Sequence, residues 1–282
     1  MRLRKRPTSS KKGLALISNG LVVAAGEQQG YQAPTIDDMH LPAIFEIGSF
    51  AFGKQMLLVM LSVVIVAGFF MYAARKRAMV PSRTQFIGEM GYGMARNSLG
   101  KEIIGAHAYK PFVPLLFTAF FFILVNNLYG SIPLIQLPTM SYVGSAYALA
   151  IIAYVTWVGV GIKRKGLGTF FKDMTMPSGV PPVIYVILIP IEFMSNMLIR
   201  PATHALRLFA TMFGGHLAIM VAASLTQYLI MEAGGFAALA SVGSGVLGIF
   251  LFFLELMIQC IQAYVFTLLL AVYLQGSVSE GH

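Results

Sequence analysis

Apolar runs long enough to cross a bilayer are the feature that most constrains the fold of this chain. Met56–Ala74 is a run of about 19 apolar residues, close to the roughly 20 that span the hydrocarbon core as a helix. Of the 282 residues, 57% are hydrophobic and 11% are charged, whereas soluble domains are about 25% charged. Because helices satisfy their own backbone polar groups inside lipid, the sequence predicts an all-α polytopic membrane protein.

Basic clusters between the apolar runs predict how the chain crosses the membrane. Phe112–Tyr129 and Tyr142–Ile162 are the second and third apolar runs, and basic residues follow the first run at 75–77 and the third at 163–165. Lysine and arginine are enriched in cytoplasmic loops. We therefore expect the N-terminus to lie outside and the C-terminus in the cytoplasm.

Two later segments are too long for ordinary upright crossings. Val180–Val221 holds about 40 mostly apolar residues and Ala237–Tyr273 about 37, and at about 1.5 Å per residue either exceeds a core of roughly 30 Å. Pro201 is expected to kink or break the first of them. The sequence thus predicts about five membrane segments, the last two long, tilted and hairpin-like.

The remaining parts complete the expected organisation. Pro81–Asn97 has apolar residues at helical spacing and predicts an amphipathic helix at the cytoplasmic interface. Residues 1–50 form a basic leader, for which a secretory signal and a flexible tail on anionic lipid both remain open. Residues 51–282 are predicted to form a single transmembrane domain.

Charge and cysteine content exclude several kinds of partner. The formal charge is +9, but the basic residues lie between apolar runs, so membrane lipid and not nucleic acid is the expected partner. The single cysteine, Cys260, excludes disulfides within the chain and Cys-based metal sites, and we expect it to be a small buried hydrophobe. No cofactor or metal site is predicted.

Arg207 is the last lysine or arginine in the chain and lies inside the first long segment. A guanidinium stays charged and costs roughly 2.5 to 3.5 kcal/mol near a bilayer centre. Thr211 lies one turn away on the same face, whereas His216 lies about 13 Å further along the axis and points the other way. Arg207 has no acidic residue one turn away, so an external carboxylate is its simplest partner.

The last segment carries Glu255, Gln259 and Gln262 at spacing i, i+4 and i+7, which places them on one stripe of a helix. Such a stripe cannot face lipid because unsatisfied polar groups are costly there. It must face another helix, a partner protein or a water-filled path. For the two glutamines, simple hydrogen bonding between helices remains the alternative.

Other polar residues of these segments are candidates for proton transfer. His216 and Glu255 can relay protons together, since imidazole titrates nearest neutrality among side chains. Glu192 and Asn196 form another i, i+4 pair, with Ser195 beside them. A packing histidine at 216 and a surface glutamate at 192 remain the alternatives, and His204 has no predicted role.

Short motifs spread over most of the chain match one known pattern. The most specific are Arg200-Pro201, LRLF at 206–209, MFGGH at 212–216 and IQAYVF at 261–266. Supporting matches are NLYGSIP at 127–133, GIK at 161–163 and PIE at 190–192. Together they resemble subunit a of the bacterial F-type ATP synthases, the stator half of the proton channel in the F0 sector.

The resemblance implies a role for each matching residue. Arg207 would face the ion-carrying carboxylate on each passing subunit of a c-ring, with Gln262 close to it. The external half-channel would be lined by His216 and Glu255. The cytoplasmic half-channel would be lined by Glu192, Ser195 and Asn196. Relative to one familiar bacterial arrangement, the acid and the histidine are exchanged, and Thr211 stands where the family often has asparagine.

The resemblance also implies the setting of the protein. We expect a bacterial plasma membrane, proton transport coupled to rotation and ATP synthesis, and three kinds of protein partner: c-ring subunits, the subunit b peripheral stalk and other ATP synthase subunits. The chain is not expected to be an enzyme alone, because it lacks a GxxxxGK[ST] nucleotide-binding loop.

Two alternatives belong to other functional classes. A secondary transporter would bind an anionic substrate at Arg207, although such folds usually carry internal repeats that this sequence does not show. A purely structural subunit would use its polar residues only to hold helices together.

Overall fold

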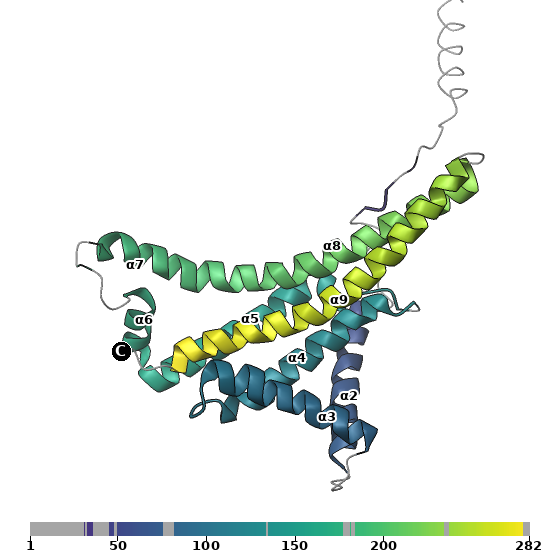
Figure 1. The fold of residues 1–282 in the computed structure, drawn as a ribbon. Coiled ribbons are helices and arrows are strands. Elements are labelled where there is room, and N and C mark those ends of the chain that lie inside the picture. The colour runs from purple at the N-terminus through teal and green to yellow at the C-terminus, as the bar shows by residue number, and fades with distance from the viewer. Residues whose placement is uncertain are drawn as a thin grey trace, which may run out of the picture.

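The computed structural model describes residues 31, 33–35, 45–47, 50–75, 82–133, 135–176, 181, 184–233 and 237–278. These residues form a helical protein (Figure 1), with one short antiparallel pair of strands, β1 (Phe45–Ile47) and β2 (Phe50–Phe52). Five helical stretches within them are long and apolar enough to cross a membrane. The all-α polytopic fold is confirmed, while most of the predicted leader lies outside the described residues.

The first three predicted crossings are present as α2 (Lys54–Ala74), α4 (Val113–Leu128) and α5 (Val143–Lys165). The end of α5 follows from its sequence. Three basic residues occupy its last turn, where their positive charges interact favourably with the negative end of the helix dipole. Gly166 follows at φ 79°, a left-handed conformation that glycine adopts without strain, and this ends the helix.

The predicted interface helix is α3 (Arg83–Met94), which continues as a π-helix over Ala95–Ile104. It begins at Ser82, whose side chain accepts a hydrogen bond from the Gln85 backbone N–H, as a helix N-cap does. Its buried face is polar or small, whereas the large apolar side chains are exposed: Phe86, Ile87, Met90 and Tyr92. These side chains are directed away from the helix bundle, as expected of a helix lying at a lipid surface.

The two long segments form a hairpin of extended helices. The first runs through α7 (Tyr185–Met194), a π-helix (Ser195–Ile199) and α8 (Arg200–Tyr228); the second is α9 (Ala237–Val278). Pro201 has no N–H for the carbonyl four residues earlier, and the π-helix lies directly before it. The predicted kink is thus a local change of helical geometry and not a break.

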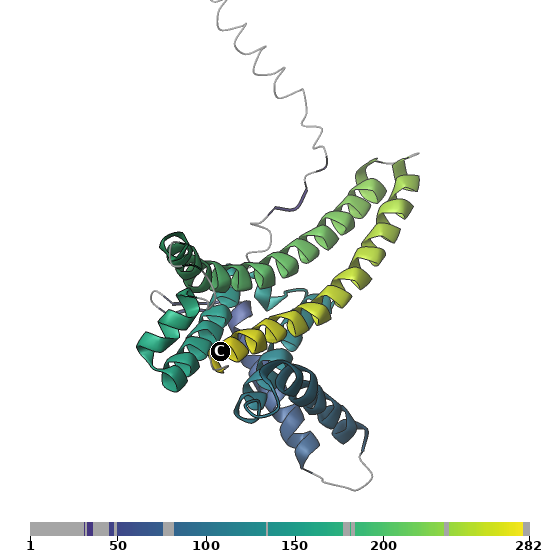
Figure 2. The same ribbon diagram turned by 60° about the vertical axis from the view of Figure 1, so that its left-hand side comes forward.

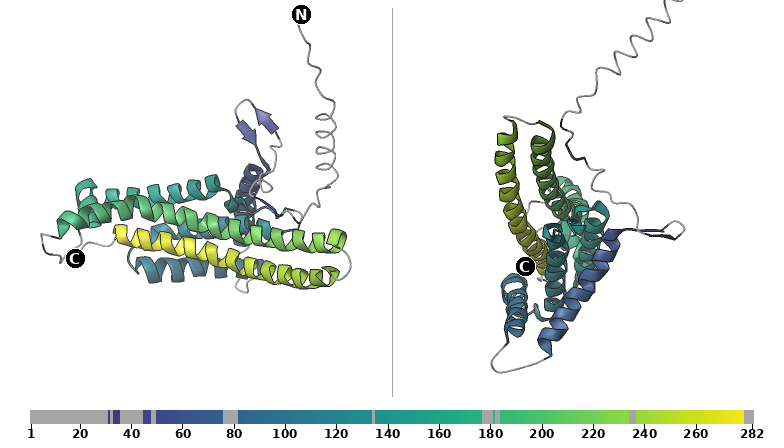
Figure 3. Two further views of the ribbon diagram at one scale, coloured as in Figure 1. Left: turned by 90° about the horizontal axis from the view of Figure 1, so that it is seen from above. Right: turned by 90° about the vertical axis from the view of Figure 1, so that its right-hand side faces the viewer.

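The direction of the hairpin differs from that of α2. Figures 2 and 3 show α8 and α9 side by side along most of their length. Their direction crosses that of α2 steeply (Figures 1 and 3). Because helices of this length exceed the hydrocarbon core when upright, tilt relative to the membrane stays the prediction.

Most of the core lies among α4, α5, α8 and α9. Its fully buried side chains include Leu116, Leu208, Phe266 and Leu270. A polar cluster ties α2 to α4: Asn126 donates to Ser62 Oγ at 2.8 Å and accepts from Thr139 Oγ1 at 2.6 Å. Because α8 and α9 are held on one side by this core, their other faces remain exposed.

We predict that Gly161→Ala destabilises the protein, because a Cβ at this position of α5 would clash with the ring of Phe170 in α6 (Leu167–Thr175). Overpacking of this kind costs about 1–3 kcal/mol. The matched control is Gly159→Ala, where a Cβ meets nothing within 4 Å and helix propensity gains up to about 1 kcal/mol. Thermal unfolding of the purified protein in detergent measures both, and equal midpoints for the two variants would contradict the packing.

Candidate functional site

Two groups of polar side chains lie on the hairpin, and Arg207 lies between them along the segment formed by α7, the π-helix and α8. Glu192 is 15 residues before Arg207, or about 22 Å along a helix axis, and His216 is nine residues after it, or about 13 Å. The segments that hold them are apolar over most of their length.

The first group centres on Glu255, whose side chain is only 2% exposed. Its Oε1 lies 3.9 Å from His216 Nδ1 on α8 and accepts a hydrogen bond from Gln259 Nε2 at 3.2 Å. Gly215 permits this approach, because a Cβ there would lie 3.2 Å from Glu255 Cγ. An acid and an imidazole are thus paired across the α8–α9 contact, close enough to exchange a proton through one small movement or one water molecule.

The turn after α4 packs against this pair. Ser131 Oγ donates to Gln259 Oε1 at 2.7 Å, and Asn127 Nδ2 donates to the Gln259 backbone carbonyl at 3.3 Å. His216 interacts with the backbone of Gln136, an exposed residue with φ 45°. The pair therefore lies near the α4–α5 connection, which is exposed at Gln136.

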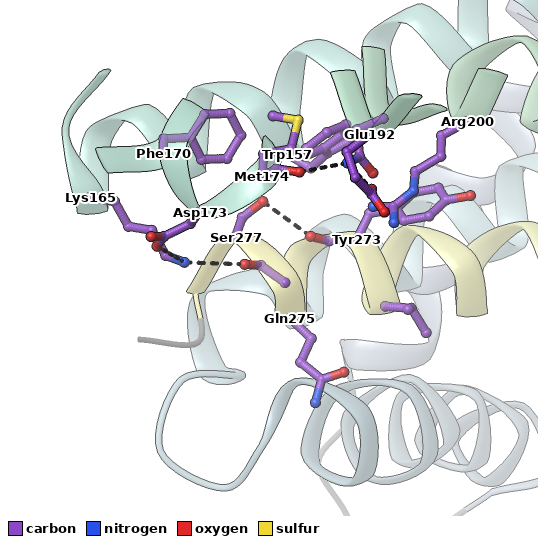
Figure 4. Close-up of a pocket in the computed structure, with 13 residues that line it drawn as sticks. Trp157, Lys165, Phe170, Asp173, Met174, Glu192, Arg200, Tyr273, Gln275 and Ser277 are labelled. Atoms are coloured by element: carbon purple, nitrogen blue, oxygen red, sulfur yellow. Dashed lines mark hydrogen bonds and ion pairs between the residues drawn. The ribbon is translucent and has the colours of Figure 1, made fainter. Parts of the chain in front are cut away.

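The second group lines a cavity of about 600 Å³ between α5, α6, α7 and the end of α9 (Figure 4). Asn196 is 3% exposed, and its Nδ2 donates to Glu192 Oε2 at 3.1 Å and to the Met174 carbonyl at 2.9 Å. Glu192 and Asn196 line the cavity, whereas Ser195, which lies between them in sequence, does not. Both members of the predicted pair thus lie at one cavity.

Charged side chains give this cavity its electrostatic character. Lys165 Nζ lies 3.1 Å from Asp173 Oδ2. Arg200 extends over the ring of Tyr273, with Cζ 5.7 Å from the ring centroid. Both signs of charge are therefore present (Figure 4), so the cavity is suited to water and small ions more than to an apolar ligand.

Arg207 lies on an exposed face of α8, together with small or short side chains at Thr203, Ala210 and Gly214. It makes no side-chain hydrogen bond or ion pair within the described part of the chain. The hydroxyl of Thr211 donates to the Arg207 carbonyl at 2.8 Å, so it is satisfied within the helix. The guanidinium is thus left available to a group outside this chain.

Two buried polar side chains lie on the faces of α8 and α9 that pack together. Gln262 is 5% exposed and its Nε2 has no hydrogen-bond partner among the described residues. His204, one turn before Arg207, is 3% exposed and stacks on Phe266 with ring centroids 3.8 Å apart. Neither ring nitrogen of His204 has a hydrogen-bond partner in the described chain.

The predicted stripe is confirmed, because Glu255, Gln259 and Gln262 are all buried against the bundle. The expectation for Cys260 is wrong: it is exposed. The physical reason is its position directly after Gln259, which turns it away from the packed face toward the exposed one.

Several contributing residues were not identified from the sequence. Ser131 and Asn127 belong to the NLYGSIP motif, which was noted but given no site role, and Gln136 had no signal at all. Lys165, Asp173 and Tyr273 reach the cavity from three different elements. Their convergence depends on tertiary packing, which no local pattern encodes.

Comparison with known proteins identifies relatives over nearly the whole chain. The family model described as "ATP synthase A chain" matches residues 56–275. A protein of Pseudarthrobacter chlorophenolicus named ATP synthase subunit a is 52% identical over 263 residues, covering 92% of this chain and 97% of that protein. Proteins of the same name from a Nocardioides species and from Streptomyces lividans are 46% identical (93% of this chain, 98% of theirs) and 40% identical (82% and 81%).

The cavity leads to a labelling prediction. In a Cys260→Ser background, a cysteine replacing the exposed cavity residue Gln275 should react with a membrane-impermeant thiol reagent at least about tenfold faster than one replacing its neighbour Leu274, since thiol reactivity requires exposure. Leu274 is 0% exposed and is the matched control. Labelling rates in membranes open at both faces provide the measurement, and similar rates would show that this end of α9 is packed differently.

Proposed function

Because the chain belongs to the ATP synthase A chain family, and so is a multi-pass membrane subunit of the proton-transporting F0 sector, we propose that it forms two separate half-channels joined only through a c-ring. The observation that carries this proposal is the position of Arg207. Its guanidinium is exposed and has no acidic partner in the described chain, and it lies between two polar groups that do not meet.

The external half-channel is proposed to end at His216 and Glu255. A proton arriving along the α4–α5 connection reaches this buried pair and passes to a carboxylate on the ring. The pair suits this step because the histidine and the acid are 3.9 Å apart and nearly excluded from water. Either group can hold the proton while the other is free.

The cytoplasmic half-channel is proposed to be the cavity lined by Glu192 and Asn196. It lies beside Lys165, at the end of α5 that carries a basic cluster, and such clusters remain in the cytoplasm. This assignment puts the α4–α5 connection and the N-terminus outside and the C-terminus in the cytoplasm. Ser195 is a neighbour of the path and not part of its lining.

Arg207 is proposed to keep the two paths apart. Its fixed charge stabilises a deprotonated ring carboxylate and repels a proton that would otherwise pass directly from one half-channel to the other. Ring rotation then becomes the only route across. Each elementary charge releases about 2.3 kcal/mol per 100 mV of membrane potential, so several protons must act together for each ATP made by the other subunits.

The remaining assignments belong to the same proposal. Among the described residues the Gln262 amide nitrogen, in the α8–α9 interface, has no hydrogen-bond partner, and we propose that this side chain orients groups around Arg207. The partners would be c-ring subunits on the exposed face of α8, the subunit b peripheral stalk, other ATP synthase subunits, and lipid against the exposed apolar side chains of α2.

We predict that Arg207→Ala abolishes ATP-driven proton pumping while the complex still assembles, because neutralising this site removes the barrier between the paths. Arg207→Lys keeps the charge but loses the planar fork of donors. We expect it to retain less than about a tenth of the pumping rate, which corresponds to a barrier raised by about 1.4 kcal/mol. The measurement is the quenching of a pH-sensitive dye as inverted vesicles acidify after ATP is added. Arg83→Ala, at an exposed position of α3, is the control.

The same experiment separates the alternatives. Loss of binding of an anionic solute, with no effect on ATP-coupled pumping, would favour a secondary transporter. Failure of assembly alone would favour a structural subunit. Normal coupled pumping by Arg207→Ala would refute the proposed channel.

A further inference from the structure

We propose that Gln259, held by Ser131, is a positioning residue that fixes the carboxyl group of Glu255 for proton transfer on the external side. The inference rests on the proposed function and adds residues to which neither the motifs nor the relatives give a role. It identifies a chain of three side chains, from the exposed turn to the buried acid.

The hydrogen bonds determine which way the Gln259 amide points. An ionised carboxylate only accepts hydrogen bonds, so the oxygen of Glu255 must face the NH₂ end of the amide, which it does at 3.2 Å. The oxygen end is then directed to Ser131, whose hydroxyl donates at 2.7 Å. Asn127 adds a donor to the Gln259 backbone carbonyl, which holds this turn of α9 against the end of α4.

The amide assigns different tasks to the two carboxyl oxygens. Oε1 is occupied by the Gln259 N–H and faces His216, whereas Oε2 makes no hydrogen bond within the described chain. A proton therefore binds most readily to Oε2, without displacing the amide. Gln259 itself has no titratable group, so it directs the proton without carrying it.

Few charges compete with this arrangement. From α8, His216 is the ionisable group that faces Glu255; from α9, Gln259 is neutral; and from α4 and its following turn, Asn127 and Ser131 are neutral. Within the described residues, the carboxyl group is therefore controlled by one imidazole and one amide.

Simple adhesion between helices would not require this geometry. Apolar side chains can hold two helices together, but they leave a buried carboxylate without a donor, which is costly in a dry site. Gln259 is 0% exposed, Glu255 is 2% exposed, and Gly215 leaves the space that lets α8 approach them. The site is built around the acid.

For the test, the complete ATP synthase complex is reconstituted in liposomes and its catalytic sector is then removed. Passive proton conduction through the F0 sector that remains in the membrane is measured. Gln259→Leu should reduce conduction about tenfold and Ser131→Ala about threefold, as expected for losing a hydrogen bond to a charged group and one to a neutral group. The double variant should match Gln259→Leu alone, because Ser131 acts only through Gln259.

Two further variants separate positioning from a general structural role. Ser131→Thr keeps the hydroxyl and should restore conduction to near the wild-type level. Ser145→Ala is the matched control, because this nearby serine bonds only to backbone carbonyls of its own region and its loss should change nothing.

Three results would overturn the inference: wild-type conduction in Gln259→Leu, additive losses in the double variant, or no difference between Ser131→Ala and Ser131→Thr. If Gln259→Leu does not assemble, the two Ser131 variants decide alone. The proposed function is tested separately by Arg207→Ala. If that variant still pumps, the channel proposal fails; if it does not pump while the Ser131 and Gln259 variants behave as wild type, only the positioning role fails.

Discussion

A polar side chain inside a bilayer has no water to satisfy it, and the packing of α8 against α9 follows from that cost. Glu255, Gln259 and Gln262 all lie on the one face of α9 that is buried. Rotating α9 by half a turn would expose this acid and these amides to lipid. The polar stripe therefore fixes which faces of the hairpin meet, and apolar packing of Phe266 and Leu270 strengthens that choice.

Arg207 differs from these three side chains because it is exposed. It lies on the face of α8 opposite to His216 and makes no side-chain hydrogen bond or ion pair among the described residues. A charge within a bilayer is tolerated best when an opposite charge compensates it. In the proposed complex an acid on a partner subunit would compensate this charge, which agrees with membership of a family of complex subunits.

The number, order and approximate ends of the membrane helices were predictable because a run of about 20 apolar residues has few alternatives in lipid. The effect of Pro201 was less so. Proline removes one hydrogen bond, but whether the helix then breaks, bends or adopts π geometry depends on what packs around it. The exposure of Cys260 was misjudged for a related reason, since an apolar segment does not itself indicate which side faces the protein.

By itself, the sequence determined the spacing along each helix. It placed Glu255 and Gln259 on one stripe and set Arg207 and His216 on different faces, because helical geometry converts spacing directly into direction. Only the tertiary structure decided what each face meets: that Gly215 brings His216 to Glu255, that Ser131 reaches Gln259, and that the cavity gathers residues from six elements. Ser131 and Gln259, for example, are 128 positions apart, and local periodicity carries no information about such contacts.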